Sequence, residues 1–146
     1  MAKISMRGRV EAPPEELFDL LADPENEVQW NPDVLEIRRV DDGPVGVGSR
    51  WRGRYRGIGT MEITLSECER PQRLAFATKG SRMDMDFHFA FAPADTATEL
   101  ASHAEIRPKG ALRLMAPLMG PMMRRTFSQR PAQMAEGVAK RRAARA

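Results

Sequence analysis

The sequence contains a single cysteine, Cys68, in 146 residues, which leaves no internal disulfide and no thiolate-rich zinc site. It also lacks any apolar run long enough to span a bilayer. The first ten residues, MAKISMRGRV, alternate in polarity where a secretory signal would carry a continuous apolar block. We therefore expect a cytoplasmic protein. The length fits a single domain over residues 1–146, with about 140–146 as a frayed tail.

An excess of positive charge is confined to one end of the chain. The net charge is +3 and the isoelectric point is about 9.5. From Arg124 onward seven basic residues stand against one acidic residue, Glu136, and the preceding residues carry a net charge of −3. The basicity belongs to a terminal segment, so the isoelectric point gives little support for a nucleic-acid partner. A basic tail that recruits another protein is an alternative that this distribution leaves open.

Seven segments alternate apolar and polar side chains with the period of a β-strand. They are residues 3–11, 34–40, 49–56, 60–69, 73–79, 83–91 and 98–106. The connections between the last six are rich in glycine and proline, which favours an antiparallel meander. Helical periodicity appears after the first strand, in APPEELFDLLADPE and ENEVQW, and again from Gly110 onward. Pro131 should kink or split this last helix.

In GSRWRGRYRGIG, residues 48–59, an arginine occupies every second position. Basic residues interleaved with aromatic residues are typical of grooves that bind single-stranded nucleic acid. A hairpin turn around Gly57–Gly59 would set Tyr55 opposite Met61, Trp51 opposite Leu65 and Arg54 opposite Glu62. The arginines then share one face of the sheet and the aromatic rings the other, so the rings cannot stack on bases held by the arginines. We expect no nucleic-acid partner.

The same alternation in the other strands predicts one apolar face for the whole sheet. Only one long helix is available to cover that face, so the sheet must curl around it. Side chains alone do not easily fill such a space, which favours an internal cavity.

The chain resembles the START-related SRPBCC superfamily, also called polyketide cyclase/dehydrase-like proteins. The residues that carry the resemblance are VEAPPEELFDLLADPENEVQWNPDV, GPVGVGSRW, ERPQRLAF, FAFAPADTATEL and PKGALRLMAPLMGPMMRRTF. It implies an α+β helix-grip fold: a seven-stranded curved antiparallel sheet wrapped around a long C-terminal helix, with two short helices after strand 1. It also implies a hydrophobic tunnel between sheet and helix that binds lipids, sterols or polyketides.

The inward side chains are the predicted ligand contacts, although each can equally be plain core packing. They are Trp30, Trp51, Tyr55, Met61, Ile63, Phe76, Met85, Phe87, Phe89, Ser102, Met115, Met119 and Met122. The interior polar candidates are Tyr55, Ser102, Thr78 and Glu67. Tyr55 and Ser102 are the candidates for acid or base catalysis, but no nucleophile with an adjacent base is apparent, and the catalytic residues stay unknown.

Other side chains suggest functions that we regard as less favoured. Asp84, Asp86, His88 and His103 have the ligand types of a metal site, but they should lie on the wet face, and we expect no metal and no cofactor. Cys68 is expected to be a bystander. The methionine-rich stretch that begins the last helix could touch a membrane transiently during ligand delivery, but not insert stably.

The sequence therefore predicts a monomer or homodimer that binds or transports a small hydrophobic ligand, whether lipid, sterol or polyketide-like. The alternative is an enzyme of the cyclase or dehydratase type that acts on an aromatic or polyketide substrate in the same tunnel.

Overall fold

The computed structural model describes residues 2–145. The strands are β1 (Ala2–Val10), β2 (Val34–Arg39), β3 (Arg50–Tyr55), β4 (Gly59–Glu69), β5 (Arg73–Gly80), β6 (Met83–Ala94) and β7 (Ala97–Pro108). The helices are α1 (Pro14–Ala22), η1 (Pro24–Gln29), η2 (Gly110–Met115), α2 (Ala116–Phe127) and α3 (Arg130–Arg145), where η marks a 3-10 helix. This order agrees with the predicted helix-grip fold.

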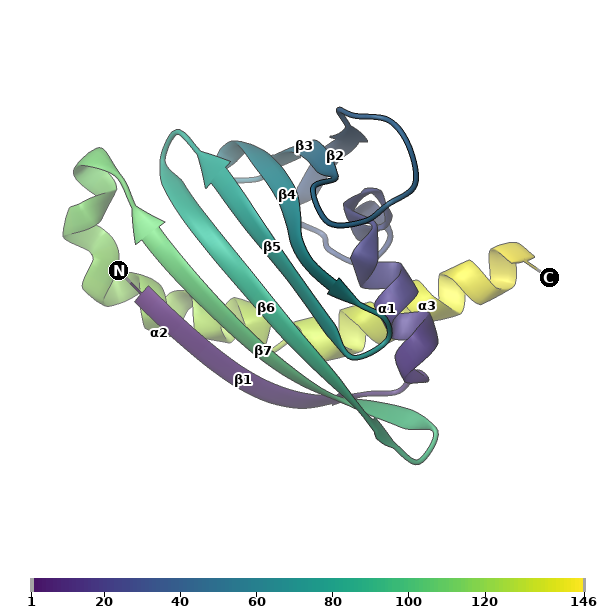
Figure 1. Ribbon diagram of the computed structural model, residues 1–146. Coiled ribbons are helices and arrows are strands. Elements are labelled where there is room, and N and C mark those ends of the chain that lie inside the picture. Colours follow the sequence, from purple (N-terminus) through teal and green to yellow (C-terminus); the bar gives the residue numbers. More distant parts are fainter. Residues whose placement is uncertain (1, 146) are drawn as a thin grey trace.

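The seven strands form one antiparallel sheet in the order β1-β7-β6-β5-β4-β3-β2. Figure 1 shows the sheet curving, with α2 and α3 running across one side of it and α1 lying beside α3. Helix α1 packs against α3, and both α2 and α3 contact β1. Helices α2 and α3 thus cover the sheet face that its alternation makes apolar.

The C-terminal helix is divided into three pieces, as its prolines predict. Pro117 stands near the start of α2 and Pro131 near the start of α3. The first residues of a helix have no helical acceptor for their backbone N–H groups, so a proline there costs no hydrogen bond. Helix α2 ends at Phe127, and Ser128 and Gln129 separate it from α3. Residues 140–145, which were expected to fray, continue α3, where Lys140 donates to the Gln29 carbonyl and Arg142 pairs with Glu16.

The hairpin between β3 and β4 is tighter than predicted. Trp51 pairs with Ile63 and Tyr55 with Gly59, so the predicted register was wrong by two residues. The turn uses Gly57 and Gly59 at positive φ, which leaves a shorter loop than we assumed. A shift of two preserves the face of every side chain, so the separation of arginines from aromatic residues stands.

A bulge in β4 overturns the inward placement of Glu67. The pairing with β5 shifts between Leu65 and Glu67, and one additional residue in a strand reverses the alternation beyond it. The side chain of Glu67 is consequently exposed. It is no interior polar candidate.

The core consists of two clusters along the inner face of the sheet. One lies under α1 and α3 and includes Phe18, Trp51 and Leu74, all almost fully buried. The other lies under α2 and is richer in methionine, with Met61, Met85 and Met119. Between residues 2 and 145, no helix is long and apolar enough to cross a membrane.

Candidate ligand cavity and its polar side

A cavity of about 420 Å³ lies between the inner face of the sheet and the segments η1, α2 and α3. Its wall contains members of both core clusters, such as Ile63 and Phe76 from the first and Met61 and Met85 from the second. The packing is discontinuous at this point because the broken C-terminal helix does not fill the curve of the sheet.

Most of the predicted ligand contacts line this cavity. They are Trp30, Tyr55, Met61, Ile63, Phe76, Met85, Phe87, Phe89 and Ser102. Phe87 and Phe89 lie with parallel rings, their centroids 6.4 Å apart, and Phe127 of α2 meets Phe87 edge-on with centroids 6.2 Å apart. Whether these side chains touch a ligand remains a prediction.

Four predicted contacts lie elsewhere. Trp51 is fully buried in the first core cluster, edge-on to Phe76. Met119 is buried in the second cluster. Met115 and Met122 are exposed on the outer side of η2 and α2, together with Leu114 and Leu118. The sequence reasoning placed Met115 and Met122 on the inward face of the last helix, but the rotation of η2 and α2 in the structure turns Met119 toward the sheet and these two outward.

The interior polar candidates have different surroundings. Thr78 lines the cavity, but its hydroxyl donates to the Met85 carbonyl at 2.8 Å. The Ser102 hydroxyl has no hydrogen-bond partner within residues 2–145 and stands on the sheet wall among apolar side chains. Tyr55 lies at the end of β3, opposite that wall, beside η1.

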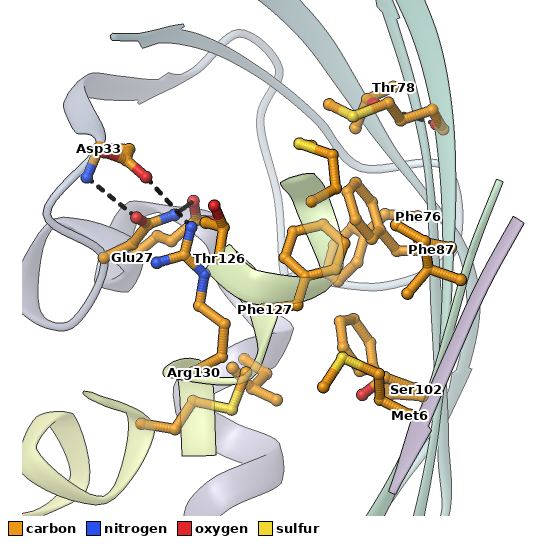
Figure 2. A pocket seen from close by; sticks show the side chains of 18 of the residues that line it. Met6, Glu27, Asp33, Phe76, Thr78, Phe87, Ser102, Thr126, Phe127 and Arg130 are labelled. Atoms are coloured by element: carbon orange, nitrogen blue, oxygen red, sulfur yellow. Dashed lines mark hydrogen bonds and ion pairs between the residues drawn. The ribbon is translucent and has the colours of Figure 1, made fainter. Parts of the chain in front are cut away.

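A polar cluster on the helical side of the cavity was missed by the sequence reasoning. It consists of Glu27, Asn31, Asp33, Tyr55 and Arg130, and all five line the cavity. Figure 2 shows Glu27, Asp33 and Arg130 close together, facing the sheet wall that carries Phe76, Phe87 and Ser102. Asn31 Nδ2 donates to Glu27 Oε2 at 2.9 Å, and the Arg130 guanidinium lies 3.3 Å from the Asp33 carboxylate.

Among the carboxyl groups that the structure describes, Glu27 has the most strongly raised pKa. Loss of hydration raises its pKa from 4.5 to about 7, although donation from Asn31 and Tyr55 and the charge of Arg130 act in the opposite direction. Burial, followed by the charge of Glu27, also raises the pKa of the Tyr55 phenol. Glu27 therefore exchanges a proton near neutral pH inside an apolar cavity, which is the property required of an acid or base catalyst.

Two signals could have found this cluster. Glu27 and Asn31 are four residues apart, and the Asn31 backbone N–H donates to the Glu27 carbonyl at 2.8 Å, so one helical turn places both side chains on one face. Arg130 directly precedes Pro131, at the helix break, and the sequence reasoning counted it only as part of the basic tail. Its side chain is 13% exposed, in contrast to the solvated arginines of that tail.

The outward polar residues form surface pairs. Asp84 lies 2.9 Å from Lys109, and Asp86 lies 2.9 Å from Arg107. No group of three or more His, Cys, Asp or Glu residues in the described part of the chain could hold a metal ion.

In the arginine-rich strand, Arg52 pairs with Glu62 and Arg54 with Glu36, which replaces the predicted pairing of Arg54 with Glu62. Burial raises the pKa of the Cys68 thiol, which disfavours the reactive thiolate.

A curved antiparallel sheet that holds C-terminal helices against its inner face, with a cavity between them, defines a START-related helix-grip protein. The family described as "Polyketide cyclase / dehydrase and lipid transport" matches residues 1–141, and the chain belongs to that family. Among curated proteins, none matches the sequence.

Several solved structures share the fold at low sequence identity. A START superfamily protein from Mycobacterium smegmatis is 18% identical, with a TM-score of 0.71, and the match covers 97% of each chain. A protein from Thermus thermophilus is 18% identical with a TM-score of 0.75, covering 94% of this chain and 97% of the other. A conserved protein from Geobacillus kaustophilus is 11% identical with a TM-score of 0.77, covering 94% and 95%. These likenesses concern the fold alone.

Proposed function

We propose that this protein binds a small, mainly apolar molecule in the cavity between its sheet and α2 and α3. The observation that carries the proposal is the cavity of about 420 Å³, walled largely by methionine, phenylalanine and isoleucine side chains. The side chains around an apolar space of this size make fewer packing contacts than those of a filled core. An apolar ligand supplies these contacts and also removes its own apolar surface from water. Methionine side chains adapt to irregular shapes, which suits a wall that closes on a ligand.

The ligand classes that fit this proposal are lipids, sterols and aromatic or polyketide-like molecules. A cytoplasmic location and a monomer or homodimer as the working form remain predictions from the sequence, as does the lack of a nucleic-acid partner. The protein then serves as a carrier or receptor for its ligand.

Thermal-shift screening and native mass spectrometry of the purified protein test this proposal. A compound that binds only the folded state raises the melting temperature in proportion to the logarithm of its concentration above Kd. We expect at least one fatty acid, sterol or aromatic polyketide to raise it and to appear as a one-to-one complex. If no apolar compound does either, the binding function is wrong.

A cyclase or dehydratase type of enzyme is the second candidate, and the position of Glu27 favours it. A carboxylate with a pKa of about 7 can remove a proton from the carbon next to a ketone carbonyl, breaking the C–H bond and leaving an enolate, and can then return the proton. The Tyr55 hydroxyl donates to the ionised Glu27, and once Glu27 has taken the proton the same hydroxyl is free to donate to the enolate oxygen.

Hydrogen exchange of 2-tetralone in D₂O, followed by NMR, tests this second candidate. An enzyme should accelerate the exchange, and Glu27→Gln should abolish the acceleration while 2-tetralone still binds. Exchange that is no faster than in buffer, with binding demonstrated, would rule out proton abstraction by Glu27.

A further inference from the structure

Two of the five N–H donors of Arg130 and one amide donor of Asn31 are occupied by acceptors of the protein. Arg130 Nη1 donates to Gln133 Oε1 at 2.8 Å, and Nη2 donates to Asp33 Oδ2 at 3.3 Å. Asn31 donates from Nδ2 to Glu27 and accepts from the Asp33 backbone N–H at 3.0 Å. These bonds hold the cluster in one arrangement before any ligand enters.

The acceptors of the cluster are less fully used. A carboxylate has about four lone-pair positions on its two oxygens, and Glu27 receives only the Asn31 amide and the neighbouring Tyr55 hydroxyl. The Tyr55 oxygen, once it donates to Glu27, still has lone pairs of its own. Glu27 and Tyr55 can therefore accept a further hydrogen bond, and the Trp30 indole N–H beside them has no partner, so a group that both donates and accepts fits this side of the cavity.

Building on the proposed function, we propose that the ligand is an uncharged apolar molecule with one hydroxyl group, a phenol or an alcohol, which donates a hydrogen bond to Glu27. The apolar body of the ligand lies against the Phe and Met side chains of the sheet wall, on the opposite side of the cavity (Figure 2). The hydroxyl group replaces the water that a buried carboxylate would otherwise need.

The charges next to Glu27 disfavour a ligand carboxylate bound against it. The groups that face Glu27 are Tyr55 of β3, Arg130 of α3 and, through Arg130 and Asn31, Asp33. One positive charge on Arg130 is already matched by the negative charge of Asp33, and Glu27 adds a second negative charge when ionised. A further carboxylate beside an ionised Glu27 would face this negative charge, whereas Arg7 and Arg56 line other parts of the cavity wall.

A matched set of naphthalene probes, measured by equilibrium dialysis, tests the proposal. 2-Naphthol donates and accepts a hydrogen bond, 2-methoxynaphthalene only accepts, 2-methylnaphthalene does neither, and 2-naphthoate is charged. We expect 2-naphthol to bind about tenfold more tightly than 2-methoxynaphthalene, since a hydrogen bond to a charged acceptor contributes roughly that factor. We expect 2-naphthoate to bind most weakly.

Glu27→Leu should remove the preference for 2-naphthol and leave the binding of 2-methylnaphthalene at least as tight. Glu25→Leu, an exposed change in the same 3-10 helix, is the matched control and should keep the preference. If Glu27→Leu fails to fold, the wild-type protein gives the same answer through pH. Since an ionised acceptor is the stronger one, the preference for 2-naphthol should rise between about pH 5 and about pH 8.

The outcomes separate this proposal from the function on which it rests. Equal binding of 2-naphthol and 2-methoxynaphthalene, a preference for 2-naphthoate, or a preference that disappears in Ser102→Ala but persists in Glu27→Leu would overturn the hydroxyl proposal and leave apolar binding intact. Failure of all four probes to bind would contradict the binding function itself.

Discussion

Glu27 shows how strongly one side chain depends on its surroundings. In water its carboxyl group would be ionised throughout the physiological range. In this fold it lies in an apolar cavity with Asn31, Tyr55 and Arg130 as partners, and its pKa rises to about 7. The proton-binding group of the cavity is thus created by burial, which the amino-acid type alone does not reveal.

The raised pKa makes the stability of the protein depend on pH. The folded state binds the Glu27 proton more tightly than the unfolded chain, so the free energy of unfolding falls as pH rises from about 4.5 to about 7 and then levels off. The contribution is up to about 3 kcal/mol, at about 1.4 kcal/mol per pH unit. Glu27→Gln cannot ionise and should be more stable than wild type at about pH 8, with a smaller difference at about pH 5.

Urea unfolding of both proteins at these two pH values measures the effect. Glu25→Gln, at an exposed position of the same helix, is the control and should follow wild type at both. A difference between Glu27→Gln and wild type that is the same at both pH values would mean that Glu27 titrates normally.

The inward side chains of the strands could be predicted residue by residue, whereas the polar cluster could not. Alternation places Phe76, Met85 and Phe87 on the cavity side without knowledge of the turns. Glu27 and Arg130 are more than a hundred positions apart in the chain, and only the path of α3 past η1 brings them together. Charged residues in helical segments are usually exposed to solvent, so the sequence pattern predicts an exposed position for Glu27 and for Arg130, and the structure places both at the cavity.

At the scale of elements, the sequence predicts which face of the sheet a side chain occupies better than it predicts which residues pair between neighbouring strands. The β3–β4 pairing was wrong by two residues because the turn length, rather than the alternation, sets the register. The β4 bulge that exposes Glu67 adds a residue without any glycine or proline to mark it. Pro131 is an explicit marker, and it predicted the break before α3, whereas Pro121 lies inside α2 without interrupting it.

The fit of α3 against η1 and α1 is tight at Gly137. A Cβ atom there would lie 2.9 Å from Trp30 Cβ and 3.1 Å from Leu20 Cδ2, closer than packed atoms allow. Gly137→Ala should therefore destabilise the protein by about 1 kcal/mol, because steric crowding exceeds the gain in helix propensity.

Gly120→Ala is the matched control, since apart from its chain neighbours nothing lies within 4 Å of the added atom in α2. It should stabilise the protein by up to about 0.5 kcal/mol, because Pro121 directly after it reduces the gain in helix propensity. Chemical denaturation of both variants checks the pair. A gain of stability in Gly137→Ala as large as that in Gly120→Ala would mean that α3 does not pack this closely on Trp30.

Helix α2 has two different faces at adjacent positions. Leu118 is 65% exposed and Met119 is 5% exposed, under the second core cluster. Met119→Ala should lower the free energy of unfolding by about 2–4 kcal/mol, whereas Leu118→Ala should change it by less than about 0.5 kcal/mol. Thermal and urea unfolding measure both values. Equal losses would mean that α2 is rotated about its axis relative to this structure.

At the scale of the whole molecule, the cavity results from the mismatch between a curved seven-stranded sheet and a helix that is broken near its middle. The sequence predicted that one face of the sheet is apolar and that only one long helical segment is available to cover it. It therefore also predicted an internal cavity. The position of that space depended on where α2 and α3 separate, and the exposure of Met115 and Met122 depended on how η2 and α2 are rotated on the sheet.

The most direct test of the central claim is equilibrium dialysis of 2-methylnaphthalene against wild-type protein and two variants of β7. Ser102→Phe places a ring in the cavity, and Ala101→Phe places the same ring on the opposite face of the same strand. We predict one-to-one binding by wild type and Ala101→Phe, and its loss in Ser102→Phe. No binding by folded wild-type protein, or equal binding by Ser102→Phe, would contradict a ligand site in this cavity.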